Sequence, residues 1–526
     1  MFGGRDMCMK KIWFGLAAAL AAVAVAWGEE AQDGTPPAAQ EAAAPGMPAE
    51  VDLAFCLRTA LERNLDLQME RLSREEADLE VEVARGAYDP ELSVSVGREH
   101  SETDGEAAGT AEGALETMRT ERDDDTVSAS LSGKIGPGGG TYELAARNGD
   151  SSGTRGGSPF DSNTGRVGVS LKQPLLKGFG TDESRYRIAT AKVQSQEAAL
   201  ALEEEVQRLL GDVEKAWYAL MEAKESREVQ KEALRLSEQL LADNRRKVKI
   251  GTMSSLDEKQ AESQAASARA DLVSAEQAIV KAENALKALV WNDLRSVWAA
   301  EVPATGMLTE PAADATAPDA GAAMEVALAA RPDLRAARLA LERQGYAVDL
   351  YRNQRLPALD LVAGGGLQAS DEEGAGDVWS TIADADEPYW NVGVTLSIPL
   401  GNRAAKNRFL QSQATAERMR LQVRRQEEDA MAEVVDASAE VRSCLLRVEA
   451  TRDAAEYAEA ALEAEQRKLD QGRSTSFVVL QLQQDLTEAR RAKTGALADY
   501  HKSLVDFALA EGRMLERHGL EMGALE

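Results

Sequence analysis

The side chains with which this sequence could perform chemistry are its histidines, its cysteines and its clustered carboxylates. The histidines are three and widely separated: His100, His501 and His518. Such a distribution argues against a catalytic triad or a histidine-rich metal site. The acidic runs Glu203–Glu205 and Asp123–Asp125 are typical of a solvated helix face and of a loop. The sequence therefore predicts no enzyme, no cofactor and no metal site.

Two glycines that interrupt long helical patterns form the second group of notable residues. Gly251 stands in KIGTMSSLDEKQAE, and Gly472 stands in LDQGRSTSFVVLQLQQ. Glycine commonly ends a helix because it tolerates a positive φ angle. We therefore expect two helical hairpins with their turns at these glycines.

Each of these turns follows a predicted helix of unusual length. Helix-period sequence runs without a proline over 181–250 and again over about 403–470, and return helices are predicted over 255–291 and about 475–512. At 1.5 Å per residue, each longer helix would span roughly 100 Å. The same order of elements occurs twice, which indicates an internally duplicated fold.

A further helical segment precedes each half of the chain. These segments are 51–86 and 323–352. Stacked end to end with a return helix, each would give a column as long as one long helix. We expect each to complete the column of the other half, so that 51–86 would sit above 475–512. The result would be four antiparallel columns.

Bulk composition limits the class of protein and its partners. The net charge of −29 argues against nucleic acid, whose phosphates would be repelled. Aromatic residues make up only 5%, and the Ala-, Glu- and Leu-rich composition is typical of long helices and coiled coils.

The N-terminus reads as a targeting segment. Lys10 and Lys11 precede the apolar run 12–27, which predicts a signal peptide over 1–28, with a short N-terminal anchor as the alternative. Translation could also start at Met7 or Met9. A Pro/Ala-rich linker is predicted over 29–50.

Removal of the signal peptide would leave two cysteines. Cys56 and Cys444 do not make a disulfide framework, so we expect two buried, reduced thiols, with pairing as the alternative.

Four short segments alternate between apolar and small or polar residues: ELSVSVGRE (91–99), RVGVSLKQP (166–174), LPALDLVAGG (356–365) and NVGVTLSIP (391–399). Strands of this length and pattern suit an outer-membrane β-barrel; the alternative is a β-sandwich. Four strands cannot close a barrel, and an open edge in lipid leaves unpaired backbone groups. The barrel must therefore close with other copies.

A β-hairpin predicted over 126–148 leaves the strand count open. We favour a hairpin outside the barrel, which gives a trimer twelve strands; if it entered, a trimer would have eighteen. Four aromatic residues lie at strand ends and suit either an interfacial girdle or local packing. They are Tyr88, Phe179, Tyr389 and Trp390.

The order of these features resembles the TolC-like outer-membrane efflux protein family. The resemblance covers about 51–512 and rests on the duplicated strand–long-helix–turn–helix halves, on QPLLKGFG and IPLGNR at strand ends, and on the glycine-marked turns. It implies a mixed, mainly α fold, in which the duplicated halves form part of a trimeric outer-membrane β-barrel and a periplasmic α-helical barrel. The domains expected are repeats at 51–292 and 322–512, an equatorial irregular segment at 293–321 and a C-terminal tail at 513–526.

The same resemblance implies a function. The chain would be a homotrimeric channel-tunnel in the outer-membrane lipid, giving substrates of a tripartite efflux or type I secretion system an exit across periplasm and outer membrane. Its partners would be a periplasmic adaptor (membrane fusion) protein and an inner-membrane pump of the RND, ABC or MFS type. The alternative is a periplasmic coiled-coil scaffold without a pore.

The resemblance also assigns roles near the turns. Asp257 matches a family Asp that ties the closed entrance, whereas the tying Arg is shifted by one position to Arg473, so we expect an Asp257–Arg473 contact. Two positions that are acidic in some members are here Val478 and Gln481, and Asp485 is a possible substitute. Four residues are expected to contact the adaptor: Gly251, Met253, Leu256 and Gly472.

Overall fold

The protein is described here from a computed structural model. The structure describes residues 50–106, 117–136, 138–155, 158–312, 314–371, 375–520 and 522. The predicted signal peptide and almost all of the predicted linker lie outside these residues. The elements below belong to one compact unit, 50–292 with 301–526. The helix α6, Leu294–Val297, belongs to a second unit.

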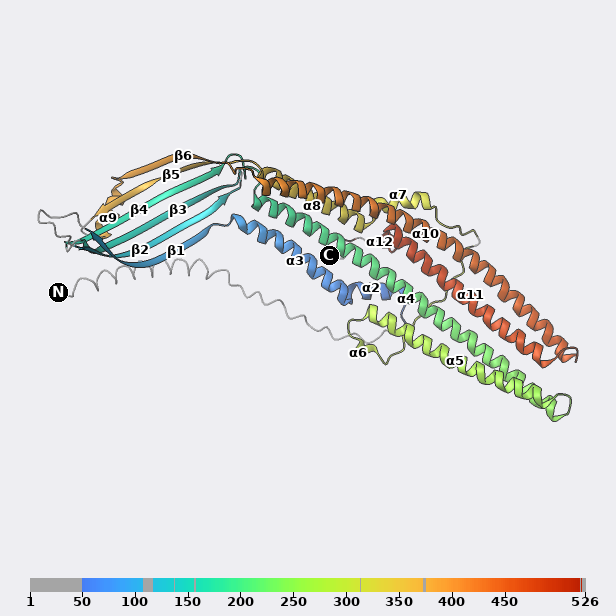
Figure 1. The fold of residues 1–526 in the computed structure, drawn as a ribbon. Coiled ribbons are helices and arrows are strands. Elements are labelled where there is room, and N and C mark those ends of the chain that lie inside the picture. The colour runs from blue at the N-terminus through green and yellow to red at the C-terminus, as the bar shows by residue number, and fades with distance from the viewer. Residues whose placement is uncertain are drawn as a thin grey trace. The chain divides into compact units, whose positions relative to one another are not determined.

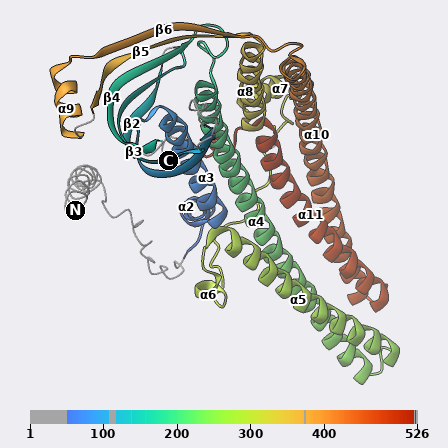
Figure 2. The ribbon, with the colours of Figure 1, turned by 60° about the vertical axis from the view of Figure 1, so that its left-hand side comes forward.

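Six antiparallel strands form one sheet in the order in which they occur in the chain (Figure 1). They are β1 (Glu91–Glu106), β2 (Thr117–Ile135), β3 (Gly140–Arg155), β4 (Ser158–Pro174), β5 (Ala358–Asp371) and β6 (Pro388–Ser397). All four segments predicted as strands lie within or overlap these elements. Figure 2 shows the sheet curved like part of a cylinder wall.

The predicted hairpin is an integral part of the sheet. Its strand β2 pairs with β1 from Glu91↔Ser132 to Glu106↔Thr117, and with β3 as far as Ile135↔Gly140. Gly138 takes a positive φ of 97° in the turn between β2 and β3, a conformation that glycine tolerates. The expectation of four strands per chain, with the hairpin outside the sheet, is therefore wrong. The hairpin enters because its side chains alternate in phase with those of its neighbours.

One face of the sheet carries apolar side chains in every strand; those of β5 are half-buried, and each of the other five strands has exposed ones. Directly paired residues share a face, so the registers define this set. We call it the apolar belt: Leu92, Val94, Val96, Val127, Ala129, Leu131, Leu144, Ala146, Val167, Val169, Leu171, Leu359, Leu361, Ala363, Val392, Val394 and Leu396. Val392 is 65% exposed and Val96 is 61% exposed, so the single chain leaves these side chains uncovered.

The opposite face, which we call the polar face, is lined by hydroxyl and charged groups. The hydroxyls of Ser95 and Ser128 lie 2.7 Å apart across β1 and β2. Lys172 Nζ lies 2.9 Å from Asp360 Oδ2 across β4 and β5. The sheet therefore separates an apolar side from a polar side, as a barrel wall between lipid and water does.

Two pairs of long helices run from the sheet. The helix α4 (Glu183–Lys249) turns into α5 (Ser255–Val290), and α10 (Arg403–Asp470) turns into α11 (Ser476–Glu511). Asp182 caps α4 by accepting from Arg185 N at 3.0 Å, and Arg246, Lys247 and Lys249 lie in its last turn. Acidic starts and basic ends stabilise helices through the macrodipole. The predicted long helices and return helices are confirmed.

The shorter helices stack within their own halves, so the expected exchange between halves is wrong. They are α2 (Leu53–Arg63), α3 (Leu65–Arg85), the 3₁₀ helix η1 (Gly86–Tyr88), α7 (Ala320–Ala330) and α8 (Pro332–Gln354). The short helix α12 (Met514–Arg517) follows α11 and also meets α4 of the first half, where Arg517 Nε lies 3.6 Å from Glu214 Oε1. Asn64 Nδ2 donates to Leu289 O at the end of α5, at 3.1 Å. The chain leaving α5 holds α2 there, because Val51 N donates to Pro303 O at 3.1 Å.

Apolar clusters join the helices of the two hairpins. One consists of Leu240 from α4, Leu462 from α10, and Val479, Leu480 and Leu486 from α11. The remaining helix, α9 (Ala375–Asp384), packs Val378 and Ile382 against Ala369 of β5. Among the helices of the described residues, none combines the length and the hydropathy that a transmembrane span requires.

Candidate functional site at the helical turns

Both hairpin turns end their long helix in the same way. Gly251 and Gly472 take positive φ angles of 76° and 70°. Thr252 N donates to Lys247 O at 3.0 Å, and Arg473 N donates to Lys468 O at 2.8 Å. These bonds satisfy carbonyls that the helix end would leave free. The two predicted turns are therefore present with matching geometry.

Asp257 has a local role in the single chain. Its carboxylate accepts from Ser254 N at 3.2 Å, and the Ser254 hydroxyl accepts from Leu256 N at 3.2 Å, so Asp257 closes a capping box on α5. No hydrogen bond or ion pair joins its side chain to Arg473 in the described part of the chain. The expected contact is absent within one chain, and it stays a prediction for the assembled entrance.

A buried asparagine joins the two hairpins instead. Asn244 of α4 donates through Nδ2 to Ser476 Oγ of α11 at 2.6 Å and to Asp257 O of α5 at 3.3 Å. Asn244 is fully buried and Ser476 is 1% exposed. A hydrogen bond between buried side chains of two hairpins resists their separation. Sequence reasoning missed this residue, although Asn244 follows Ser237 and Leu240 at helical spacing on the buried face of α4.

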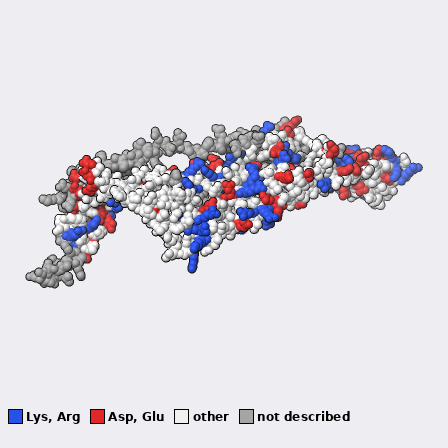
Figure 3. Space-filling model, turned by 90° about the horizontal axis from the view of Figure 1, so that it is seen from above, with Lys and Arg blue, Asp and Glu red and all other residues white. Residues whose placement is uncertain are grey.

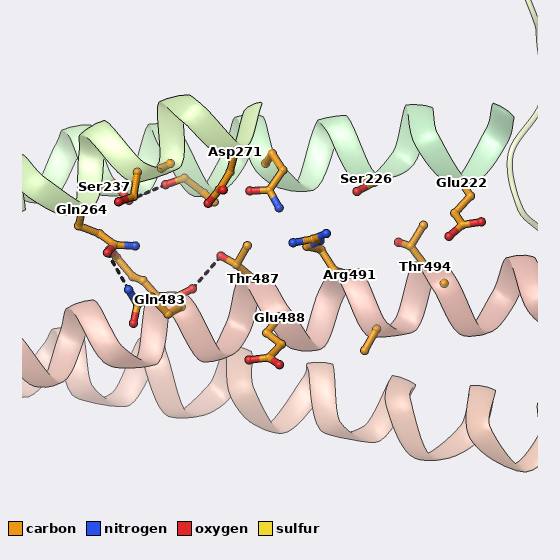
Figure 4. Close-up of a pocket in the computed structure, with 17 residues that line it drawn as sticks. Glu222, Ser226, Ser237, Gln264, Asp271, Gln483, Thr487, Glu488, Arg491 and Thr494 are labelled. Atoms are coloured by element: carbon orange, nitrogen blue, oxygen red, sulfur yellow. Dashed lines mark hydrogen bonds between the residues drawn. The ribbon is translucent and has the colours of Figure 1, made fainter. Parts of the chain in front are cut away.

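Farther from the turns than this bond, α4, α5 and α11 line a polar cavity of about 590 Å³, which we call the polar seam. Gln484 Nε2 donates to Gln264 Oε1 at 2.7 Å across it. Arg491 points from α11 toward the other two helices, with Glu222 on α4 (Figure 4). Gln483 is buried, and its Oε1 has no hydrogen-bond partner among the residues that the structure describes. The hairpins thus meet partly through polar groups, not through a continuous apolar core.

The other residues predicted near the turns lie on the surface of the chain. Val478, Gln481 and Asp485 are exposed and follow each other at helical spacing, so they share one side of α11. Leu256 is 63% exposed, and Met253 is half-buried. These side chains are free to face the lumen, a neighbouring copy or another protein.

The four aromatic residues predicted at the membrane interface lie in four different environments. Trp390 is 80% exposed and lies on the side of the apolar belt, opposite Gly365. Tyr389 lies on the polar face, where the Arg166 guanidinium is 4.7 Å from its ring. Phe179 is exposed after β4, and Tyr88 is half-buried in η1. Of the two neighbours in β6, only Trp390 faces the side on which lipid would lie.

Two histidines that are distant in sequence lie beside one stretch of α4. The ring of His501 stacks on Tyr218 at 4.8 Å, and its Nε2 lies 2.9 Å from Thr309 O. His518 Nε2 lies 2.8 Å from Oε1 of the buried Glu214. Burial lowers the pKa of His501, so a neutral ring is favoured there. The wide separation of these histidines in the sequence did not predict that they lie close to the same helix. They do so because the C-terminal part of the chain folds back onto α4.

Both cysteines of the described chain are free and buried, as expected. Burial raises the pKa of the Cys56 thiol to about 12. Burial also raises the pKa of Cys444, whose Sγ lies 3.1 Å from Arg447 Nη2. Buried protonated thiols are inert and act as small apolar groups.

Comparison with known proteins gives a consistent result. A family model described as "Outer membrane efflux protein" matches residues 56–290 and 323–513. The chain is 25% identical over 358 residues to the outer membrane efflux protein BepC of Brucella suis biovar 1 (strain 1330), which covers 67% of this chain and 73% of BepC.

Solved structures share the fold. The Campylobacter jejuni CmeC outer membrane channel matches with a TM-score of 0.64 at 17% identity, over 90% of each chain. The open state of the Neisseria gonorrhoeae MtrE outer membrane channel matches with a TM-score of 0.61 at 18% identity, over 88% of this chain and 89% of MtrE. The family resemblance and the fold class inferred from the sequence are confirmed.

Proposed function

Because the chain belongs to the outer membrane efflux protein family, we propose that it is the exit duct of a tripartite efflux system or of a type I secretion system. The family consists of channels, not enzymes, that lie in the outer membrane and extend into the periplasm. The finer role rests on the chain's own features. Small molecules and exported proteins are both possible cargo, and a pump or adaptor encoded beside this protein would distinguish them.

The apolar belt carries the proposal. Alternate apolar side chains run from Trp390 in β6 to Ile398, one residue past the strand, roughly 26 Å at 3.3 Å per residue. Strands of outer-membrane barrels tilt by about 35–45°, so this run would cover about 20 Å of a lipid-facing band that is about 25 Å tall. An uncharged stretch covers much of the sheet in Figure 3, with charged side chains at its outer end and along the helices. Lipid would cover this surface, whereas a soluble scaffold without a pore leaves it unexplained.

The open sheet requires further copies of the chain. Among the described residues, β1 and β6 each have a strand partner on one side only. Unpaired backbone groups in lipid cost several kcal/mol each. Because the six strands are antiparallel, β6 of one copy would run antiparallel to β1 of the next. A homotrimer would then close a barrel of eighteen strands, six from each copy.

The periplasmic entrance lies at the turns in this proposal. Val478 and Gln481 would line a constriction without acidic groups, and Asp485 would supply the charge one turn further. The Asn244–Ser476 bond would hold the two hairpins of one copy together in the closed state. Asp257 and Arg473 would meet between neighbouring copies. Opening would then separate hairpins that meet partly through polar groups.

The turns are also the proposed site for the adaptor. Gly251, Met253, Leu256 and Gly472 offer small and apolar surface at the ends of both hairpins. An α-helical hairpin of a periplasmic adaptor would dock there and link the duct to an inner-membrane pump. The duct itself would need no cofactor.

Three measurements test the function. Purified protein in a planar bilayer should give discrete single-channel steps, and the unheated protein should migrate on a gel as a heat-modifiable trimer. Cell fractionation should recover it with the outer membrane. Recovery in the soluble periplasmic fraction, without channel activity, would contradict the proposal and favour the scaffold.

A further inference from the structure

A histidine and two glutamates converge on the outer ends of β1 and β2. The ligand atoms of His100, Glu102 and Glu121 all lie within 4.8 Å of one another. His100 Nε2 is 3.6 Å from Glu102 Oε1. We propose that these three side chains bind a divalent transition-metal ion of the zinc class.

The sheet register fixes this convergence. His100 and Glu102 are two residues apart in β1 and therefore lie on the same face. Glu121 is the direct partner of Glu102 in β2, and Asp123 is the direct partner of His100. The four side chains form a square on adjacent strands. Two ordered strands thus position the ligands, and no loop is needed.

A neighbouring carboxylate orients the imidazole for metal binding. Asp123 Oδ1 lies 2.7 Å from His100 Nδ1. When Nδ1–H donates to this carboxylate, Nε2 is left as the free ligand atom, and it is Nε2 that faces Glu102. This arrangement, in which a carboxylate holds the second nitrogen of a metal-ligating histidine, orients the ring and raises its basicity.

The charges of the cluster favour a cation. Glu102, Glu121 and Asp123 lie together, and Arg119 pairs with Oε2 of Glu102, which leaves Glu102 Oε1 toward His100. One imidazole and two carboxylates suit Zn²⁺, which commonly takes three protein ligands and keeps a fourth position for solvent. All three proposed ligands are exposed, so a metal ion can reach them.

The site lies away from the polar face. His100 and Glu102 continue the alternation of Leu92, Val94 and Val96, so they project from the belt side of β1, beyond the apolar belt. A bound metal ion would therefore cross-link β1 and β2 at the outer rim without entering the lumen. The inference does not depend on the proposed transport role, because metal binding and conductance are measured separately.

The test is isothermal titration calorimetry of the untagged, full-length protein in detergent, freed of metal with a chelator and titrated with zinc chloride alone. We expect one strong site per chain in the wild type and at least about tenfold weaker binding in His100→Ala. Asp123→Asn should weaken binding about 10- to 100-fold by releasing the ring. Glu99→Gln is the matched control, because it removes a carboxylate from the other face of β1 and should bind like the wild type.

Other outcomes would overturn the proposal. If the wild type binds no Zn²⁺, or if His100→Ala binds as tightly as the wild type, the cluster is a set of surface ion pairs only. An equal loss in Glu99→Gln would assign binding to general surface charge. Trimer migration on an unheated gel serves to check that each variant is folded.

Discussion

At the scale of single residues, the buried Asn244 hydrogen-bonds to α11 of the other hairpin and to α5 of its own. A buried amide that bridges two helical hairpins stabilises one relative position of those hairpins. Removing such a group leaves its partners unsatisfied, which costs about 1–3 kcal/mol. The bonds are local in space, but they join elements that are more than 30 residues long.

We predict that Asn244→Ala weakens the closed entrance. The variant should show larger or more frequent conductance steps in a planar bilayer, because the hairpins separate more easily. Gln239→Ala, an exposed change in the same helix, is the control and should behave like the wild type. Unchanged conductance in Asn244→Ala would show that the bond does not hold the entrance.

Cysteine reactivity gives a second prediction at this scale. With a pKa of about 12, roughly one Cys56 thiol in ten thousand is ionised at pH 8. A fluorescent maleimide should therefore leave Cys56 and Cys444 unlabelled in the native protein at pH 8 and label both in denaturant. Rapid native labelling would mean that the helices around them open readily.

The half-buried His501 predicts a loss of stability in acid. Its pKa is lowered in the fold, whereas the unfolded value is about 6.5. Between these values the unfolded chain binds more protons, so stability is full above pH 6.5 and falls as the pH drops below it. Urea unfolding followed by circular dichroism should show a smaller loss between pH 7.5 and 5.5 in His501→Gln than in the wild type. An identical loss would exclude His501 as the cause.

The sequence allowed some of these residues to be predicted and not others. Gly251 and Gly472 were recognisable because a helix end has a local signature. Asn244 and Ser476 were not, because they are 232 residues apart in the chain and only packing brings them together. The same applies to His501 and His518, which meet α4 through the return of the C-terminal segment.

At the scale of elements, periodicity predicted the helices well and the sheet partly. The helices α4 and α10 are 67 and 68 residues long, and their repeating pattern has no proline to interrupt it. The hairpin of β2 and β3 was recognised but placed outside the sheet. Alternation within 126–148 suits a free hairpin as well as a wall strand, so only the pairing of β2 with β1 and of β3 with β4 decides its place.

The two faces of β1 allow a sharp prediction. Val94→Lys puts a charge on the apolar belt, and a lysine at the midplane of an outer-membrane barrel costs about 2–4 kcal/mol. Ser95→Lys puts the same charge one residue further along β1, on the polar face of the sheet. We expect Val94→Lys to reduce the heat-modifiable trimer in outer-membrane fractions and Ser95→Lys to leave it unchanged. The reverse order would mean that the faces are assigned the wrong way round.

At the scale of the whole molecule, the chain is incomplete by itself. Its belt is uncovered, and its sheet has two edges without partners among the described residues. Each copy contributes six strands to a shared barrel, so the number of copies sets the total number of strands in that barrel. The sequence indicated that copies must share a wall, but the hairpin's position raises the expected total from twelve strands to eighteen.

Disulfide cross-linking between the two edges of the sheet tests this account most directly. Single cysteines would be placed on the polar face of β1, at Ser93, Ser95 or Gly97, and combined in one chain with cysteines at Asn391, Gly393 or Thr395 of β6. After mild oxidation in membranes, at least one combination should give denatured bands of one, two and three chains, with none larger. Monomer bands alone from every combination, or a ladder that continues beyond three, would contradict a barrel closed by three copies.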